Sequence, residues 1–439
     1  MSETWEIKTI GECVRITKGV TYASSDYASD NDGHVFLTIK CFSKGGGFNT
    51  EGVKYFRGIH SSDQEIQPGE LLVAKTDLTR DGDIIGSPMI APDFGIGKKV
   101  LPSMDLSVLR PLNNETEPRF LFYRLMLGDA RRFMWAHSAG STVLHLESKA
   151  LPKFAFKLPR PNQQSRIVEI LSTLDETIEQ TEALIAKMQQ VKAGLMHDLF
   201  IRGVTSDRCL RPTREQAPDL YKESPLGWIP KEWETSPIAS IAESLVDGPF
   251  GSNLKSEHYV VEPGVRVVRL QNIQEGYYDD SDPVFVSQHH ADYLSRNAVN
   301  SGDVLIAALG DENYPVGRSC CYPVDLPPAI NKADCFRLRC LSDIAINTYM
   351  MHFLNTATAR TQIKRYEQGV TRRRTNLGNL RRIIVVLPDI DEQRRIIERL
   401  ASVSTQVEAG ELQVEKLHQQ KLGLMNDLLT GRVYVKEAC

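Results

Sequence analysis

The most cationic stretch of the sequence spans residues 360–382 and reads RTQIKRYEQGVTRRRTNLGNLRR. It carries eight cationic side chains and one anion around a Gly-Val-Thr turn. Arginine forks bind phosphates and can bridge the O6 and N7 atoms of guanine, and a threonine hydroxyl can donate to bases or backbone. A solvated basic loop is the plain alternative. We favour nucleic-acid binding, centred on Thr371, Arg372, Arg373 and Arg374.

The equivalent stretch in the first half of the chain, RRFMWAHSAGSTVLHLESKALPK, is less basic. It keeps a Gly-Ser-Thr turn with Ser141 and Thr142, and it adds His145. If both turns face DNA, the two halves should read different sequences. Weaker candidates mix hydrogen-bond donors with aromatic or apolar neighbours near predicted strand ends. They are Lys18, Thr21, Tyr22, Lys40, Lys44, Lys75, Thr76, Arg80, Asn253, Lys255, Arg269, Gln271, Asn272, Arg318 and Lys332.

The sequence contains none of the catalytic motifs expected of an enzyme acting on DNA. An [DN]PP[YFW] loop, a Gly-rich cofactor turn and a GxxxxGK[ST] loop are all absent. The nearest approach to a metal-nuclease cluster is Asp93 with Glu147 and Lys149, and chance explains that combination better. His289 and His290 lack a ligand partner at helical spacing. We predict no catalytic residue, no metal site and no cofactor on this chain.

Composition limits the class of protein. A chain of 439 residues exceeds one hydrophobic core, so two or more domains are expected. A net charge of -4 means that DNA binding must come from local patches. The eight cysteines form no CxxC pair, which favours reduced structural thiols. No apolar run has membrane-spanning length and the start lacks a signal core, so we expect a cytoplasmic protein.

An internal repeat organises the chain. The segment LPRPNQQSRIVEILSTLDETIEQTEALIAKMQQVKAGLMHDLFIRGV (158–204) aligns without a gap with residues 387–433, 229 residues later. About 18 of about 47 positions are identical, which is the signature of a structural repeat. The match extends to TWEIKTIGE against EWETSPIAS and to PGELLVAKT against SGDVLIAAL. The chain is therefore a tandem of two similar units.

Each copy of the repeat carries an apolar seam with alternating spacings of four and three residues. The seams are Ile167, Leu171, Leu174, Ile178, Thr181, Ile185, Met188, Lys192, Leu195, Leu199 and Ile396, Leu400, Val403, Val407, Gly410, Val414, Leu417, Lys421, Leu424, Leu428. This 3.5-residue period predicts two coiled-coil helices that bury each other, each on the order of 57 Å long. Asn162 and Asp391 are N-cap candidates, and Gly203 and Gly431 are stop signals.

Both seams are interrupted at the same two places. A small residue (Thr181, Gly410) and then a lysine (Lys192, Lys421) replace large apolar residues. Either a matched register or a partner contact would explain them. The lysines could face acidic groups on partner helices, because an unpaired buried lysine costs several kcal/mol, or their ammonium groups could reach solvent. Leu195 and Leu424 continue the seams beyond them.

The remaining sequence predicts two mixed α/β globules, since short β-rich runs separated by turn residues end in helical stretches. The expected fold is two globular α/β domains separated by two long helices. The expected boundaries are 1–157 and 228–386 for the globules, 158–204 and 387–433 for the helices, 205–227 for a linker and 434–439 for a C-terminal tail.

The order globule, helix, globule, helix, together with ESPLGWIPKEWE and the GLM.DLL-like helix ends, resembles the specificity subunit of type I restriction-modification systems over essentially the whole chain. Gln163 stands where the second copy has Glu392, a slight departure. The resemblance implies two target-recognition domains that each read half of a bipartite asymmetric DNA site. It also implies that the helices are antiparallel and dock two methyltransferase (modification) subunits, which bind S-adenosylmethionine. Restriction subunits would then supply cleavage that depends on ATP and magnesium.

Two DNA-binding domains joined by one rigid helix pair recognise one long site through two short contacts. Once the first domain has bound, the contact of the second domain becomes effectively intramolecular. Readers on one side of B-DNA contact half-sites about one helical turn apart, roughly 10 base pairs. We expect that adding or deleting about four residues in one helix changes the gap between half-sites. Three alternatives stay open: a DNA enzyme with an unrecognised active site, a coiled-coil adaptor for proteins without DNA binding, and the specificity subunit of another restriction class.

Overall fold

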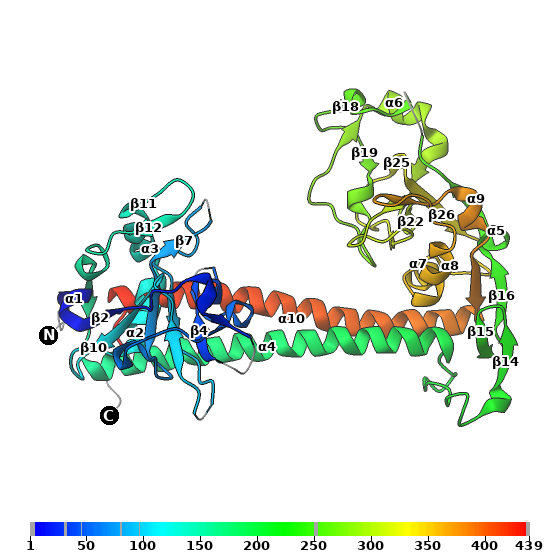
Figure 1. The fold of residues 1–439 in the computed structure, drawn as a ribbon. Coiled ribbons are helices and arrows are strands. Elements are labelled where there is room, and N and C mark those ends of the chain that lie inside the picture. The colour runs from blue at the N-terminus through cyan, green and yellow to red at the C-terminus, as the bar shows by residue number, and fades with distance from the viewer. Residues whose placement is uncertain are drawn as a thin grey trace. The chain divides into compact units, whose positions relative to one another are not determined.

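The structure, a computed structural model, describes residues 5–29, 33–44, 46–79, 81–95, 97–249 and 253–435. The chain divides into two units, Met1–Ala183 with Glu411–Cys439, and Leu184–Gly410. Each unit contains a mixed α/β globule and part of both long helices, α4 (Pro161–Ile201) and α10 (Ile390–Thr430) (Figure 1). Both helices lie within the predicted ranges. The units divide the helices between them, whereas the prediction treated the helices as segments separate from the globules.

The first globule is built on a four-stranded antiparallel sheet of order β2-β10-β6-β8. Its strands are β2 (Val14–Lys18), β10 (Leu106–Pro111), β6 (Leu71–Ala74) and β8 (Pro88–Ile90). Side chains alternate between the two faces of a strand. Leu71 and Val73 of β6 join the core that includes the helices, and Leu72 and Ala74 join a separate core on the other face. This strand is therefore apolar throughout.

The second globule repeats this sheet as β17-β26-β22-β24. Its strands are β17 (Ala242–Val246), β26 (Cys335–Cys340), β22 (Val304–Ala307) and β24 (Ser319–Cys321). Val304 and Ile306 face the core that includes the helices, and Leu305 and Ala307 face a second core. In each globule, one buried strand (β6 or β22) therefore contributes side chains to two cores, one on each face of the sheet.

Smaller elements surround the two sheets. In the first unit they are β1 (Glu6–Thr9), α1 (Ile10–Cys13), β3 (Tyr27–Ala28), β4 (His34–Leu37), β5 (Lys54–Phe56), β7 (Thr76–Asp77), β9 (Val100–Pro102), α2 (Pro118–Met126), α3 (Gly128–Ala136), β11 (Ser138–Ala139), β12 (Leu144–Leu146) and β13 (Ala155–Leu158). In the second unit they are β14 (Tyr221–Ser224), β15 (Gly227–Pro230), β16 (Glu234–Pro237), α5 (Ile238–Ile241), β18 (Tyr259–Val260), β19 (Val265–Val268), β20 (Phe285–Val286), α6 (Gln288–Tyr293), β21 (Ala298–Val299), β23 (Leu309–Gly310), β25 (Ala329–Asn331), α7 (Asn347–Leu354), α8 (Ala357–Lys364), β27 (Arg373–Arg374), α9 (Leu377–Arg381) and β28 (Ile384–Leu387). Two pairs, β4 with β9 and β19 with β25, are parallel.

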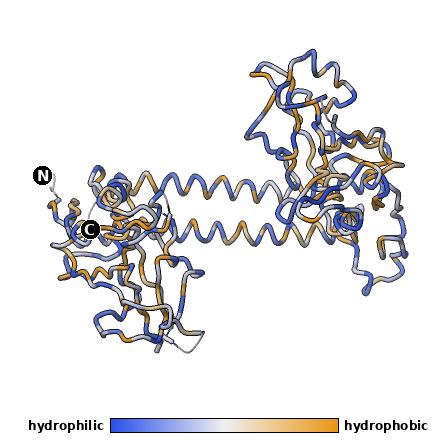
Figure 2. The backbone as a smooth tube through the Cα atoms, turned by 45° about the horizontal axis from the view of Figure 1, so that its top comes forward, coloured by the Kyte–Doolittle hydropathy of each residue, from blue (hydrophilic) through white to orange (hydrophobic). Residues whose placement is uncertain are grey.

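Both long helices contribute to the main core of each globule. Ile167 and Leu171 of α4 share the first core with Leu428 of α10, and Leu199 of α4 shares the second core with Leu400 of α10. Within each unit, the early part of one helix therefore meets the late part of the other, which makes the pair antiparallel. Hydrophobic positions recur along both helices between hydrophilic ones (Figure 2). The predicted seams are the faces that the helices bury.

The two interruptions of the second seam, Gly410 and Lys421, have physical explanations inside the chain. A Cβ atom on Gly410 would lie 2.9 Å from Cγ1 of Ile185 on α4, so the glycine makes room for that side chain. Lys421 Nζ lies 2.5 Å from Asp175 Oδ1 of α4. Lys421 therefore pairs with a carboxylate of the other long helix of its own chain, which neither of the two alternatives had named. Lys192 is half-buried in the second unit.

The helix ends differ slightly from the prediction. Asp389, rather than Asp391, accepts a hydrogen bond from the Glu392 backbone N–H (2.7 Å), because α10 begins at Ile390. Both predicted stop signals hold, since Gly203 and Gly431 follow the helices with φ of 68° and 70°.

The linker predicted at 205–227 is ordered at its end. Strand β14 pairs with β15 as an antiparallel hairpin that crosses the predicted boundary. Near the start of α10, the buried Glu392 carboxylate accepts hydrogen bonds from Arg211 Nη2 (2.9 Å), Trp233 Nε1 (3.1 Å) and the Val204 backbone N–H (2.8 Å). The bond from Arg211 joins the linker to α10, and the bonds from Val204 and Trp233 join the residues on either side of the linker to it. Among the described residues, no helix combines the length and apolar character needed to cross a membrane.

Candidate nucleic-acid interface

The two predicted turns form equivalent hairpins. In the first unit, β11 pairs with β12, and β12 pairs with β7, which follows the buried strand β6. In the second unit, Gln368 bridges Arg374, and β27 pairs with β23, which follows the buried strand β22. Each turn is thus attached to the end of the buried strand of its own globule. The repeat places the two turns at matching positions of two matching frameworks.

Glycine is required at the start of both turns. Gly140 and Gly369 have φ of 137° and 99°, which other residues rarely adopt. A Cβ on Gly140 would lie 1.9 Å from the Val143 carbonyl oxygen, and one on Gly369 would lie 2.4 Å from that of Arg372. The residues that follow project from these turns. Ser141, Thr142, His145 and Thr371 are exposed, and Val370 is 92% exposed.

The three arginines of the second turn differ in their contacts. Arg374 Nη2 lies 2.9 Å from Asp334 Oδ1, which secures the hairpin to the turn before β26. Arg373 is half-buried, and its Nη1 lies 3.9 Å from Glu367 Oε2. Arg372 is exposed and forms no ion pair within the described part of the chain. Its guanidinium is therefore the most available for a phosphate or a base.

One predicted lysine, Lys75, lies beside the hairpin of the first unit. The backbone N–H of Leu146 donates to the Lys75 carbonyl (2.8 Å), which places Lys75 beside the hairpin. Burial lowers the pKa of Lys75, and the positive charge of Lys18 lowers it further, while Asp105 opposes this. Lys18 and Lys75 therefore lie close enough to repel each other. Two cations in mutual repulsion favour a nearby anion.

Other first-unit candidates lie elsewhere. Thr21 and Lys40 are exposed, and Lys44 Nζ forms an ion pair with Asp83 Oδ2 (2.7 Å). Tyr22 is half-buried with its ring against Tyr27 and Phe36, so packing explains it. Arg80 lies outside the described residues.

Several second-unit candidates are engaged within the protein. Lys332 Nζ lies 2.6 Å from the Tyr259 hydroxyl, and Lys255 pairs with Glu257 (3.4 Å). Arg269 and Gln271 both donate to Asp282 Oδ2 at 2.9 Å. Asn253 is exposed, and its carbonyl lies 2.8 Å from His290 Nε2.

Three predicted contacts are corrected because their side chains are buried. Thr76, Asn272 and Arg318 are 6%, 2% and 4% exposed. The Asn272 side chain accepts from the Arg269 N–H and donates to the Asp279 carbonyl. Arg318 donates to the carbonyls of Leu270, Ile273 and Leu309. The Asn272 and Arg318 side chains thus hold loops of the second globule together, and none of the three side chains lies at the surface.

Two exposed aromatic rings lie beside the turns and were not among the predicted contacts. Trp135 is 57% exposed, and both its ring and Leu144 of the first hairpin line the space next to Gly82. Tyr314 is 51% exposed, and its carbonyl lies beside Gly310, which pairs with Arg373. Their sequence contexts gave no signal, because an isolated aromatic residue in a loop or at a helix end is usually buried.

The seam residues and the suspected metal ligands also have defined places. Leu195 is half-buried against the core of the second unit, and Leu424 is half-buried against the core of the first unit.

The suspected metal ligand Asp93 accepts a hydrogen bond from the backbone N–H of Gly95 (2.8 Å), which gives it a structural role. Within the described residues, no group of three or more His, Cys, Asp or Glu side chains could hold a metal ion. The seven cysteines there are free thiols.

The geometry defines a class: a tandem of two equivalent α/β units, each with a surface turn on the same framework and each completed by one antiparallel helix pair. The family described as Type I restriction modification DNA specificity domain matches residues 2–190 and 230–416, one match per repeat. The chain belongs to this family.

Similar proteins support the same assignment. The MjaVIII type I restriction enzyme specificity subunit of Methanocaldococcus jannaschii is 24% identical over 99% of this chain and 94% of its own length. The EcoBI type I restriction enzyme specificity subunit of Escherichia coli is 22% identical over 94% of this chain and 82% of its own length. Among solved structures, the type I S subunit of M. genitalium superposes with a TM-score of 0.54 at 15% identity, covering 98% of this chain and 97% of that one. A second solved structure, described as showing complex assembly and conformational transition of the type I R-M system, superposes with a TM-score of 0.58 at 16% identity. The match covers 99% of this chain and 99% of that one.

Proposed function

We propose that each unit reads one half of a bipartite, asymmetric DNA target through its surface turn, and that the shared helix pair sets the gap between the halves. The observation that carries this proposal is the pair of equivalent turns with unlike side chains. One turn presents Ser141, Thr142 and His145, and the other presents Thr371 and Arg372. Equivalent frameworks with different donors recognise different bases.

Under this proposal the chain itself is not catalytic. Two modification subunits, bound to the long helices, supply S-adenosylmethionine and methyl transfer, and restriction subunits supply cleavage dependent on ATP and magnesium. Incubating the purified chain with DNA, S-adenosylmethionine, magnesium and ATP should give no turnover. Methylation or cleavage by the chain alone would favour the rival interpretation as a single-chain enzyme.

Methylome sequencing tests the reading function. The host with the intact gene should show one bipartite methylated motif that disappears when the gene is deleted. Changing Arg372, Arg373 and Arg374 together to alanine should abolish that motif and weaken retention of the chain on duplex DNA. A motif that survives deletion of the gene would contradict the proposal, and normal retention of the variant would favour a protein adaptor.

A further inference from the structure

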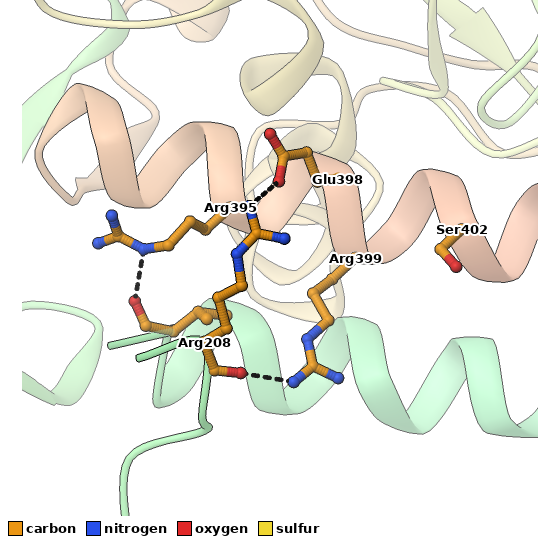
Figure 3. Close-up of a pocket in the computed structure, with 6 residues that line it drawn as sticks. Arg208, Arg395, Glu398, Arg399 and Ser402 are labelled. Carbon is orange, nitrogen blue, oxygen red and sulfur yellow. Dashed lines mark hydrogen bonds and ion pairs between the residues drawn. The ribbon is translucent and has the colours of Figure 1, made fainter. Parts of the chain in front are cut away.

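A small cavity lies between the start of the linker and the early part of α10, within the second unit (Figure 3). Its volume is about 200 Å³. Its walls are formed by Val204, Arg208, Arg395, Glu398, Arg399 and Ser402. Small-molecule sites usually measure roughly 300–1,000 Å³, so this cavity suits one or two side chains rather than a cofactor. Three of its six lining residues are arginines, which makes an anion the natural occupant.

The helix and the linker together position the guanidinium groups. Arg395, Arg399 and Ser402 are spaced by four and three residues, so they share one face of α10. Arg395 Nε donates to the Val204 carbonyl (3.3 Å), and Arg399 Nη2 donates to the Arg208 carbonyl (2.6 Å). These bonds hold both side chains at the cavity wall. Because a guanidinium has five N–H donors, each retains several for a ligand.

The remaining ion pair is exchangeable. Arg208 Nη2 lies 3.2 Å from Glu398 Oε2, with the two side chains 72% and 58% exposed. Exposed pairs of this kind contribute about 0–1 kcal/mol. Arg208 can therefore turn to an incoming carboxylate at little cost. With three cations and one anion, the cavity keeps a formal surplus of two positive charges.

We propose that this cavity binds a pair of carboxylates on an acidic segment of a protein partner. Under the proposed function, on which this inference rests, that partner is the modification subunit. Arginine forks match carboxylates in bidentate geometry. A DNA duplex carries one charge per about 1.7 Å, so its phosphates would also meet the Glu398 carboxylate in the cavity wall. Discrete carboxylates avoid that repulsion.

The repeat makes the site specific to the second unit. The positions 229 residues earlier hold Arg166, Glu169, Ile170 and Thr173. Arg166 there pairs with Glu169, and Ile170 packs against the first core where the second unit has Arg399. The first unit thus lacks the second helical guanidinium. An acidic partner should bind the two units unequally.

The first experiment titrates a blocked hexaglutamate peptide into the full chain at low salt. Arg399→Ile, which installs the residue of the first unit at an exposed position, should weaken binding at least tenfold, and Arg208→Gln should weaken it as well. Arg394→Gln is the matched control, because Arg394 lies on the same helix and pairs with Asp391. No binding to the wild-type chain, or equal binding to Arg399→Ile and wild type, would overturn the proposal.

The second experiment measures DNA retention and capture of purified modification subunits by the same variants. Arg399→Ile should lower capture of the modification subunit and leave DNA retention unchanged. If DNA retention falls instead, the cavity contacts DNA and the inference is wrong. A wild-type chain that neither retains DNA nor captures the subunit would contradict the proposed function alone, because the peptide titration is independent of it.

Discussion

Arg372 is the arginine whose removal should report most directly on DNA binding. It is exposed, while Arg373 and Arg374 also hold the hairpin through Glu367 and Asp334. Arg372→Ala should make the slope of log affinity against log salt concentration shallower by about one. The reason is that a variant with one fewer phosphate contact releases one fewer counterion when it binds DNA. Titrations of a target duplex at several salt concentrations measure this.

Arg381→Ala provides the comparison. Arg381 is exposed at the end of α9, in the same cationic stretch but outside the turn. It should change the slope less than Arg372→Ala does. Equal changes would mean that the whole stretch acts as a diffuse basic patch.

His352 should make the second unit sensitive to acid. Burial lowers its pKa from the ordinary 6.5 to about 4, and the nearby charge of Lys192 acts in the same direction. The unfolded chain takes up the proton below pH 6.5, but the folded unit resists it down to about pH 4. The stability from the neutral ring is therefore fully present above pH 6.5 and is lost as pH falls through this window.

The expected loss is about 1–2 kcal/mol between pH 7 and pH 5. His352→Tyr places there the residue found 229 positions earlier, Tyr123, and should remove most of this dependence. Urea unfolding at both pH values measures the effect. His418→Gln, at a position whose side chain is 56% exposed, should behave like wild type. An unchanged acid response in His352→Tyr would exclude His352 as its source.

At the scale of elements, the contact between Gly410 and Ile185 should determine how closely the long helices pack. A leucine at position 410 has no space beside Ile185, so Gly410→Leu should destabilise the pair by about 1–3 kcal/mol. Gly194 has no atom within 4 Å of the Cβ position, so Gly194→Ala should stabilise α4 by roughly 0.5–1 kcal/mol. Thermal unfolding of both variants tests the contrast, and a stabilised Gly410→Leu would contradict it.

The equivalent helix contacts in the two units have diverged chemically. In the first unit, Asp175 pairs with Lys421 and accepts a hydrogen bond from the Tyr123 hydroxyl (2.7 Å). Burial raises the pKa of Tyr123, and the hydrogen bond to Asp175 raises it further. In the second unit, the positions that match Tyr123 and Asp175 hold His352 and Ser404. The same framework therefore carries an ion pair in one unit and a half-buried histidine with a lowered pKa in the other.

At the scale of the whole molecule, the length of the shared helices should set the gap in the DNA target. Seven residues inserted into both helices, at the paired positions 185 and 410, keep the seam in register. The insertion lengthens each helix by about 10 Å. At 3.4 Å per base pair, the gap should grow by about three base pairs. Methylome sequencing reads the new motif, and an unchanged gap would contradict the spacer role.

The sequence by itself determined the repeat, the two long helices and the buried strands, because these depend on local periodicity. The alternating spacing in the seams and the apolar runs at Leu71 and Val304 are visible in one dimension. The Gly140 and Gly369 turns were likewise evident, since a backbone with φ above 90° needs glycine.

Only the tertiary structure decided which polar side chains are free. Arg318 looked like a DNA contact, but carbonyls from Leu270 and Leu309 surround its guanidinium. Asp175, whose carboxylate pairs with Lys421, likewise lies far from that lysine in the sequence. The cavity at Arg399 requires the linker to fold back onto α10. Burial and ion pairing depend on segments that approach from elsewhere in the chain, and the order of the residues does not specify that approach locally.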